Sequence, residues 1–230
     1  MKSEKHTKRR YDDACAAMHA MDILGERWAL AVVRELMTGP KRFTDLRAAL
    51  PAITPAVLSQ RLAGLEAAGV LRRRTLPPPS AARVLELTDW GREAEPIFVA
   101  LGRWGARSPA HDPQAPFGAA SLMLSLRTMF DPARAAGLEA RVGLRAGTED
   151  LLAEVSGGRL TVAPGPLDAA EAVLEGGPEA VGAAIYGDAP WAGLEATGAL
   201  RVLGDRALAR RFAGLFPLPP KAPPGPQTPR

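Results

Sequence analysis

The sequence has little of what metal centres, disulfide frameworks and membrane spans require. It contains one cysteine, Cys15, and three scattered histidines, so neither an internal disulfide bond nor a metal site with regular ligand spacing is expected. Its unbroken apolar runs are far shorter than the ~18 residues of a membrane-spanning helix. The first residues, MKSEKHTKRRYDD, lack the apolar run of a secretory signal. No glycine-rich phosphate loop or Ser-His-Asp set stands out either, so we expect a cytoplasmic protein that is not an enzyme and holds no metal or other cofactor.

Positive charge is concentrated in the first half of the chain. Residues 1–110 hold 18 Lys and Arg against 12 Asp and Glu, and residues 111–230 hold 11 against 13. The chain has 230 residues, 47% of them hydrophobic, which is enough for two modest domains. Only the basic half would attract a polyanion, although so small a difference also arises by chance. Residues 1–13 read as a basic flexible arm, which either contacts phosphate or stays solvated.

One stretch, residues 54–69, has the pattern of a helix with two different faces. Thr54 can cap the helix and Pro55 suits its first position. Leucines at helical spacing, Leu58, Leu62 and Leu65, form an apolar face. The opposite face carries Ser59, Gln60 and Arg61, and Gly69 ends the helix. The stretch is either the recognition helix of a helix-turn-helix or an ordinary amphipathic surface helix.

The segments before this helix favour the first interpretation. Residues 14–37 have a helical apolar stripe with a break near Leu24–Gly25. A short helix follows over residues 44–50, with Thr44 as its predicted cap and Pro51 as its stop. Its apolar residues, together with Phe43, could brace the next helix. Two short helices joined by a tight turn are the geometry of a helix-turn-helix.

The segments after Gly69 predict a wing. Residues 70–76 and 83–88 read as two strands joined by a proline-rich turn. Its arginines, Arg72, Arg73, Arg74 and Arg83, would face phosphates or the minor groove, or they merely solubilise the hairpin. A further helix begins at Thr88 and carries an apolar stripe that either closes the core or pairs two subunits. Pro96 is expected to kink this helix.

These residues together resemble the HxlR-type winged helix-turn-helix regulators, a branch near the MarR group. The resemblance covers roughly residues 12–106. The matching stretches are Asp22–Trp28, Arg34–Leu36, Gly39–Leu46, Ile53–Thr54, Leu58–Leu62, Leu65–Glu66, Gly69–Val70, Leu87–Thr88, Gly91 and Leu101–Gly105. It implies a homodimer, built from the flanking helices, on a near-palindromic operator with half-sites ~34–36 Å apart.

We expect the DNA contacts to divide between base reading and backbone binding. Thr54, Ser59 and Gln60 would read bases, and arginines would bind the backbone. The full predicted set is Arg42, Thr54, Pro55, Ser59, Gln60, Arg61, Arg72, Arg73, Arg74 and Arg83.

Cys15 matches the N-terminal cysteine that some members of this family use to sense oxidants or electrophiles. The sequence departs from the family at Ala16, where a proline is usual, and no lysine or arginine adjoins the cysteine. The alternative is a small hydrophobic residue buried in a helix. A second departure is Leu85, where members often carry a tyrosine.

The second half is predicted to be a separate α/β domain. Residues 107–117 read as a linker and residues 217–230 as a proline-rich disordered tail. Between them, apolar periodicity predicts helices over 119–130, 178–186 and 205–216. It predicts strands over 138–145, 151–155, 159–162, 170–174 and 199–203, with a turn at Gly157–Gly158.

This arrangement, over residues 118–216, resembles the sterol-carrier-like domain. The pieces that carry the resemblance are Ala172–Gly176, Ile185–Gly187, Gly198–Asp205 and Leu215–Pro217. It implies a mixed sheet with helices over one face and a tunnel for an apolar or amphipathic small molecule. Candidate lining residues, which are otherwise plain core, are Leu122, Leu126, Tyr186, Trp191, Phe212 and Phe216.

The expected fold class is therefore α+β, with an N-terminal winged helix-turn-helix domain over residues 14–106 and a C-terminal sterol-carrier-like α/β domain. The expected function is that of a homodimeric transcriptional regulator of double-stranded DNA, with no membrane partner. An apolar small-molecule effector would modulate it. The alternative is a lipid or metabolite carrier whose winged-helix half serves mainly for dimerisation; an enzyme using the apolar pocket is disfavoured by the lack of a catalytic set.

Overall fold

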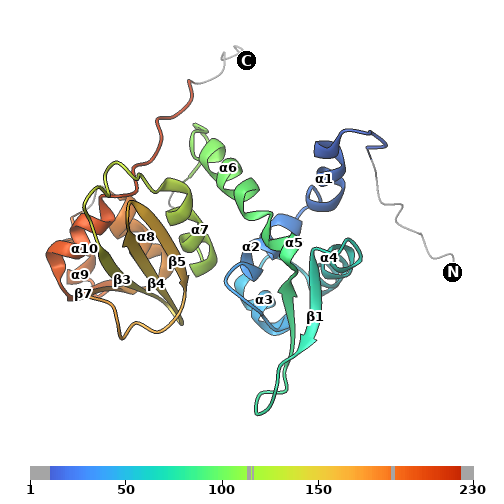
Figure 1. Ribbon diagram of the computed structural model, residues 1–230, viewed down its shortest axis with the longest axis horizontal. Helices are drawn as coiled ribbons and strands as arrows, with labels where there is room; N and C mark the ends of the chain where they lie inside the picture. The colour runs from blue at the N-terminus through green and yellow to red at the C-terminus, as the bar shows by residue number, and fades with distance from the viewer. Residues whose placement is uncertain (1–10, 113–114, 116, 188–189, 224–230) are drawn as a thin grey trace. The chain divides into compact units, whose positions relative to one another are not determined.

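The computed structural model describes residues 11–112, 115, 117–187 and 190–223 (Figure 1). The chain forms two compact units, one ending at Glu93 and the other beginning at Ala94. The sequence predicts a domain that extends to residue 106, whereas the helix at residues 95–106 lies in the second compact unit. Most of the predicted basic arm, part of the predicted linker and the end of the predicted tail lie outside the described residues.

The first unit consists of five helices and one hairpin among the described residues. In chain order its elements are α1 (Ala16–Leu24), α2 (Ala29–Leu36), α3 (Phe43–Ala49), α4 (Pro55–Ala67), β1 (Leu71–Thr75), β2 (Arg83–Leu87) and α5 (Asp89–Arg92). The predicted break between the first two helices is confirmed. The Cβ that any other residue would place at Gly25 falls 2.4 Å from the Met21 carbonyl oxygen, so this turn requires glycine.

Helix α4 begins and ends as its sequence predicts. The Thr54 hydroxyl accepts a hydrogen bond from the Val57 amide at 3.3 Å, and Pro55 occupies the first helical position. Gly69 adopts φ +79°, a left-handed conformation that glycine reaches without strain. Leu58, Leu62 and Leu65 are buried, so the opposite face of the helix is left for solvent.

Helix α3 differs from the prediction at its start. Arg42, not Thr44, is the N-cap residue, and the Asp45 carboxylate accepts the Arg42 amide at 2.8 Å. Leu46 and Leu50 pack in the core as expected, but Phe43 is 37% exposed. The helix therefore braces α4 through its leucines, while its phenylalanine lies at the surface.

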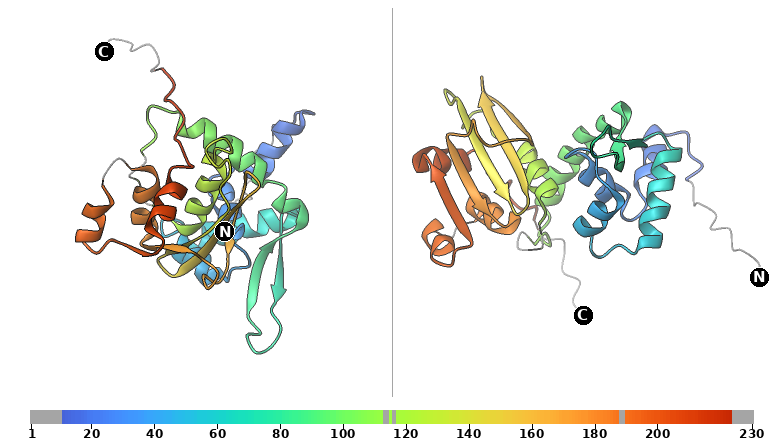
Figure 2. Two further views of the ribbon diagram at one scale, coloured as in Figure 1. Left: turned by 60° about the vertical axis from the view of Figure 1, so that its left-hand side comes forward. Right: turned by 90° about the horizontal axis from the view of Figure 1, so that it is seen from below.

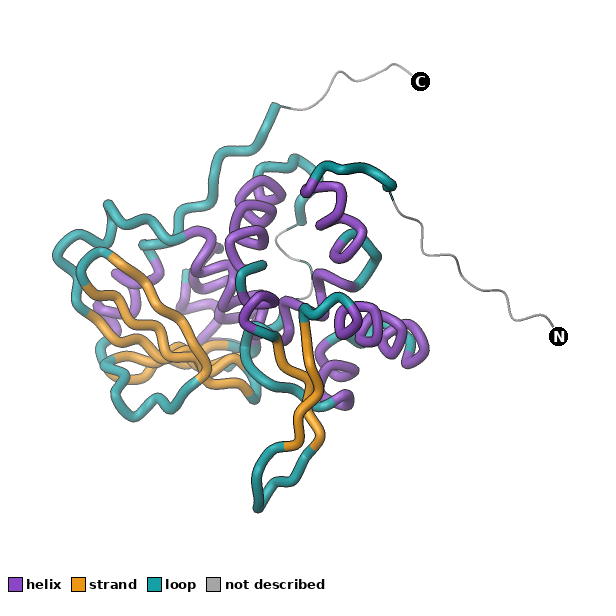
Figure 3. The backbone as a smooth tube through the Cα atoms, turned by 45° about the vertical axis from the view of Figure 1, so that its right-hand side comes forward, coloured by secondary structure: helices purple, strands orange, loops and turns teal. Residues whose placement is uncertain are grey.

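The hairpin is held to the helices at its base. β1 and β2 pair antiparallel, with Leu71 opposite Leu87 and Thr75 opposite Arg83. Leu85 exchanges backbone hydrogen bonds with Lys41 at 2.8 and 3.0 Å, and the Thr88 hydroxyl donates to the Gly69 carbonyl at 2.7 Å. The outer end of the hairpin extends beyond the helices of its own unit (Figure 3). This is the geometry of a wing beside a helix-turn-helix.

The second unit contains a five-stranded mixed sheet. Its helices are α6 (Glu95–Ala106), α7 (Ala119–Met129), α8 (Pro178–Tyr186), α9 (Trp191–Ala196) and α10 (Arg206–Ala213). Its strands are β3 (Ala140–Ala146), β4 (Glu149–Ser156), β5 (Arg159–Pro164), β6 (Ala172–Gly176) and β7 (Leu200–Gly204). The strand order is β5-β4-β3-β6-β7, and the central pair β3–β6 is parallel. The short helix α9 was not expected from the sequence.

The two faces of this sheet differ in character. Val142, Leu144 and Leu174 are fully buried beneath α8 and α10, and α7 packs on the sheet at β5 (Figure 2). The other face carries ion pairs between strands, including Arg141–Glu154 at 3.2 Å and Arg145–Asp150 at 3.1 Å. Alternation along the strands therefore separates an apolar core from a charged outer face.

Helix α6 is fixed to the second unit along one side. Arg103 donates to the Thr128 carbonyl at 2.6 Å, and Gly102 lies against the Thr128 side chain. Arg127 pairs with Glu95 at 2.7 Å. Lys221 Nζ donates to the Ala106 carbonyl at 3.1 Å, at the helix C-terminus where a cation is favourable. The kink expected at Pro96 is absent, because α5 has already ended and Pro96 lies in the first turn of a new helix.

Candidate nucleic-acid interface

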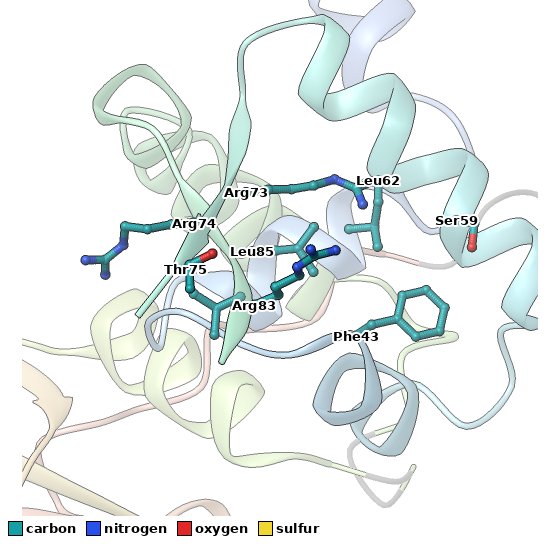
Figure 4. Close-up of a pocket in the computed structure, with 9 residues that line it drawn as sticks. Phe43, Ser59, Leu62, Arg73, Arg74, Thr75, Arg83 and Leu85 are labelled. Atoms are coloured by element: carbon teal, nitrogen blue, oxygen red, sulfur yellow. The ribbon is translucent and has the colours of Figure 1, made fainter. Parts of the chain in front are cut away.

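A groove lies between helix α4, the first residue of α3 and the hairpin. Its volume is about 460 Å³. Figure 4 shows Ser59 on one side and the hairpin arginines on the other. The lining residues are Phe43, Ser59, Leu62, Arg73, Arg74, Thr75, Arg83, Val84 and Leu85. The groove thus joins hydroxyl and guanidinium groups, which bind phosphate oxygens, over an apolar floor.

The exposed face of α4 carries polar side chains in its first half and small, non-polar residues in its second half. Thr54, Pro55, Ser59 and Gln60 are all exposed, as predicted. The remaining exposed positions are Ala56, Ala63, Gly64 and Ala67. The second half carries only alanine and glycine at its exposed positions, so it can approach another surface closely but makes no side-chain hydrogen bonds there.

Arg73 and Arg83 share the side of the hairpin that faces α4. Figure 4 shows both guanidinium groups directed toward the helix. Arg73 Nε donates to Glu66 of α4 at 2.9 Å, in a pair whose side chains are 62% and 37% exposed. Among the described residues, Arg83 has no carboxylate partner within 4.0 Å. Arg83 is therefore a free cation at the groove, and Arg73 is a cation held by an exposed ion pair.

Arg72 and Arg74 lie on the other side of β1, although Arg74 also contributes to the lining of the groove. Residues of a strand alternate between its two sides, and Figure 4 shows Arg74 directed away from Arg73 and Arg83. Both arginines pair with Glu86 of β2, at 2.8 and 2.9 Å. The hydrogen bond from Arg72 and the charge of Arg74 hold the pKa of Glu86 below its usual value despite burial. The predicted run of three phosphate-binding arginines is thus split between two surfaces.

Two other predicted DNA contacts differ in their availability. Arg61 pairs with Glu26 at 2.8 Å and its side chain is only 17% exposed, so it lies against its own unit rather than on the open face of α4. Arg42 is exposed and, within the described part of the chain, has no ion-pair partner. The sequence reasoning missed Phe43, Thr75 and the carboxylates Glu66 and Glu86. The hairpin register, with Arg72 opposite Glu86, was the signal that would have found the last of these.

Cys15 is an exposed free thiol just before α1. It is not the buried residue that the alternative prediction described. The backbone amides of Met18 and, to a smaller extent, Ala17 at the start of α1 lower the pKa of this thiol.

The six residues predicted to line a ligand tunnel lie in the interior of the second unit. Leu122, Leu126 and Phe212 are fully buried. Phe216 stacks edge-on against Phe212 with ring centroids 5.0 Å apart. The indole N–H of Trp191 donates to the Ala184 carbonyl at 2.8 Å. Five of the six side chains are buried in the core and Tyr186 is partly exposed, and their ligand role remains a proposal.

Tyr186 is the polar member of this set. Its hydroxyl lies 2.7 Å from the Ser125 hydroxyl, and burial raises the pKa of the phenol above its usual value. The pair places hydrogen-bonding oxygens in a partly buried position beside the apolar core.

Two other kinds of feature are absent from the described ranges. They contain no group of three or more His, Cys, Asp or Glu side chains that could hold a metal ion. None of the helices described is long and apolar enough to cross a membrane.

Comparison with known proteins identifies relatives of the first part of the chain. Residues 23–112 match the family described as HxlR-like helix-turn-helix. The uncharacterized HTH-type transcriptional regulator YvaP of Bacillus subtilis (strain 168) is 39% identical over 85 residues, which is 37% of this chain and 79% of the relative. The HTH-type transcriptional regulator YodB of the same organism is 32% identical over 85 residues, which is 37% of this chain and 76% of the relative.

A solved structure, the reduced form of YodB from B. subtilis, covers 44% of this chain and 100% of its own, at 29% identity and a TM-score of 0.39. These matches each cover less than half of this chain. The two sequence relatives are nevertheless matched over 79% and 76% of their own length, and both are named as transcriptional regulators. The chain therefore belongs to the HxlR-like helix-turn-helix family of transcriptional regulators.

Proposed function

We propose that this protein is a homodimeric, sequence-specific DNA-binding regulator of transcription, in which α4 enters the major groove. The backbone of one DNA strand would lie in the groove between α4 and the hairpin. The observation that carries the proposal is the placement of Ser59 on α4 across this groove from Arg73 and Arg83 on the hairpin. A hydroxyl and two guanidinium groups that converge from separate elements match the donors that position a protein on a duplex.

The individual DNA contacts follow from which polar atoms remain available. Gln60 would read a base edge with its amide, and Ser59 would contact a base or a phosphate. The Thr54 oxygen accepts the helix-capping hydrogen bond, so its hydroxyl hydrogen remains available for a phosphate. Pro55 would make only van der Waals contacts, and Arg42 would bind the backbone before α3.

The proposed dimer would form through helix α6. Ile97, Leu101 and Trp104, at helical spacing, are 44%, 45% and 76% exposed. A stripe of this kind on a helix whose other side is fixed to α7 is an unpartnered apolar surface. A second copy of α6 would bury it, and two recognition helices would then meet half-sites about one helical turn apart.

We propose further that the second unit binds an apolar or amphipathic effector, as a sterol-carrier-like domain would. The support is its mixed sheet with helices on one face, together with the partly buried hydroxyl pair of Tyr186 and Ser125 beside the apolar core. Such a ligand would regulate DNA binding only if it bound one dimer geometry better than the other. Helix α6, which belongs to this unit, is the element through which that preference would act.

Cys15 is a second candidate trigger. Its thiol is exposed and its pKa is lowered, which favours the thiolate that oxidants and electrophiles attack. The competing function is that of a lipid or metabolite carrier whose winged helix serves only for dimerisation.

Selection of bound duplexes from a random DNA library tests the proposal. A regulator enriches one near-palindromic sequence, and Gln60→Ala changes the preference at one position in each half-site. Native mass spectrometry of the freshly purified chain tests the dimer and reveals a co-purified small molecule. Uniformly weak binding to all duplexes, with a lipid retained in the protein, would favour the carrier instead.

A further inference from the structure

A buried carboxylate lies within the hairpin. The side chain of Glu86 is only 6% exposed, although β1 and β2 form a two-stranded sheet. Arg72 Nε lies 2.8 Å from one carboxylate oxygen and an Arg74 terminal nitrogen lies 2.9 Å from the other. Both oxygens are therefore occupied by guanidinium groups.

The hairpin register explains this arrangement. Glu86 lies directly opposite Arg72, and Arg74 is two residues farther along β1, so all three side chains share one face. Arg73 lies between them on the other face, opposite Leu85, and lines the groove with Arg83. Glu86 thus binds the two arginines on its own side of the hairpin, of which Arg74 also lines the groove, and does not bind Arg73 or Arg83 on the other side.

We infer that Glu86 is a positioning residue that keeps Arg72 and Arg74 away from the DNA backbone. The hairpin's phosphate contacts are then made by Arg73 and Arg83. To bind a phosphate, Arg72 or Arg74 would have to give up its ion pair with Glu86, and if both arginines left, this carboxylate would be unpaired. This inference rests on the proposed DNA-binding function. It states how many of the hairpin arginines bind DNA phosphates.

The consequence is a limit on the part of the DNA affinity that is the same for every base sequence. Each arginine that neutralises a phosphate adds about 0.9 to the slope of log K against log salt, and therefore strengthens binding to any duplex. A hairpin that presented all four arginines would bind non-cognate DNA more tightly. Glu86 removes two of those four contributions.

The test measures the binding of a non-cognate duplex by fluorescence anisotropy over a series of salt concentrations. Glu86→Gln leaves a neutral amide that holds at most one guanidinium, so the slope should steepen by about 0.9 to 1.8. Glu154→Gln is the matched control, since it removes the same charge from an arginine pair on the exposed sheet of the second unit. An equal steepening in both variants would show that net charge alone is responsible and would overturn the inference.

A second variant keeps the inference falsifiable if Glu86→Gln fails to fold in a thermal melt. The double variant Arg72→Gln, Arg74→Gln keeps hydrogen-bond donors beside Glu86. Its salt slope should equal that of the unaltered chain. A slope that flattens by about 0.9 or more would show that these arginines already contact phosphate. In that case the chain still binds DNA and only the inference fails; if the unaltered chain binds no duplex, the proposed function fails first.

Discussion

Replacing Arg73 with alanine tests whether the groove between α4 and the hairpin holds a DNA backbone. Arg73 reaches across the groove to Glu66, and its Nε lies 2.9 Å from a carboxylate oxygen. The pair is exposed, at 62% and 37% of the two side chains, so it contributes no more than about 1 kcal/mol to folding. A phosphate can therefore take the place of the carboxylate at small cost.

The expected effect on binding is larger than the effect on stability. Loss of one phosphate contact flattens the slope of log K against log salt by about 0.9, or about 8-fold in affinity at 0.1 M salt relative to 1 M. The loss should be the same for every duplex sequence, because a backbone contact carries no sequence information. Glu66→Gln should have the opposite effect, since it frees Arg73 from a pair worth at most about 1 kcal/mol, or about a 5-fold gain.

The assay is fluorescence anisotropy of a labelled duplex at five or more salt concentrations, with thermal unfolding measured in parallel. Arg92→Ala is the control, since Arg92 pairs with Asp89 at 2.6 Å on the surface of the same unit and does not line the groove. The reasoning is refuted if Arg73→Ala and Arg92→Ala give the same slope. It is also refuted if the loss in Arg73→Ala depends on the base sequence.

Three further predictions concern the rest of the chain. Trp104→Glu should shift the dimer toward monomer in native mass spectrometry without lowering the melting temperature, because this side chain is 76% exposed within one chain; an unchanged dimer would contradict the proposed interface. The thiol of Cys15 should react with iodoacetamide at a lower pH than a free cysteine derivative, because backbone hydrogen bonds lower its pKa and the thiolate forms earlier as pH rises; a midpoint at or above that of the free derivative would exclude this. Phe212→Ala should lower the free energy of unfolding of the second unit by about 3–5 kcal/mol, because it leaves a cavity beside Phe216. Leu218→Ala, at a position 46% exposed, should change it by less than about 0.5 kcal/mol in urea titrations, and equal losses would show that Phe212 is not packed as described.

Much of the local structure could be predicted from the sequence, because it depends on interactions between neighbouring residues. The caps at Thr54, Thr88 and Asp205 each accept a backbone amide within three residues. The turns at Gly69 and Gly157 need positive φ, which glycine adopts freely. Both determinants act over a few residues, so the sequence alone reveals them.

The orientation of the wing arginines could not be predicted from the neighbouring residues alone. Three arginines in succession predicted one basic surface, but alternate residues of a strand face opposite sides. Which side faces α4 depends on the pairing of β1 with β2 and on the packing of Leu71 and Leu87 against the helices. The neutralisation of Arg61 by Glu26 also joins residues far apart in the chain.

The sequence by itself determined the family, the helix-turn-helix, the hairpin and the alternation of strands and helices in the second half. These follow from apolar periodicity and turn chemistry, which act between near neighbours. Only the tertiary structure decided that α6 belongs with the second unit, and which arginines meet carboxylates and which face the groove. Those outcomes depend on which distant side chains come within hydrogen-bonding distance, and the order of residues along the chain does not specify that distance.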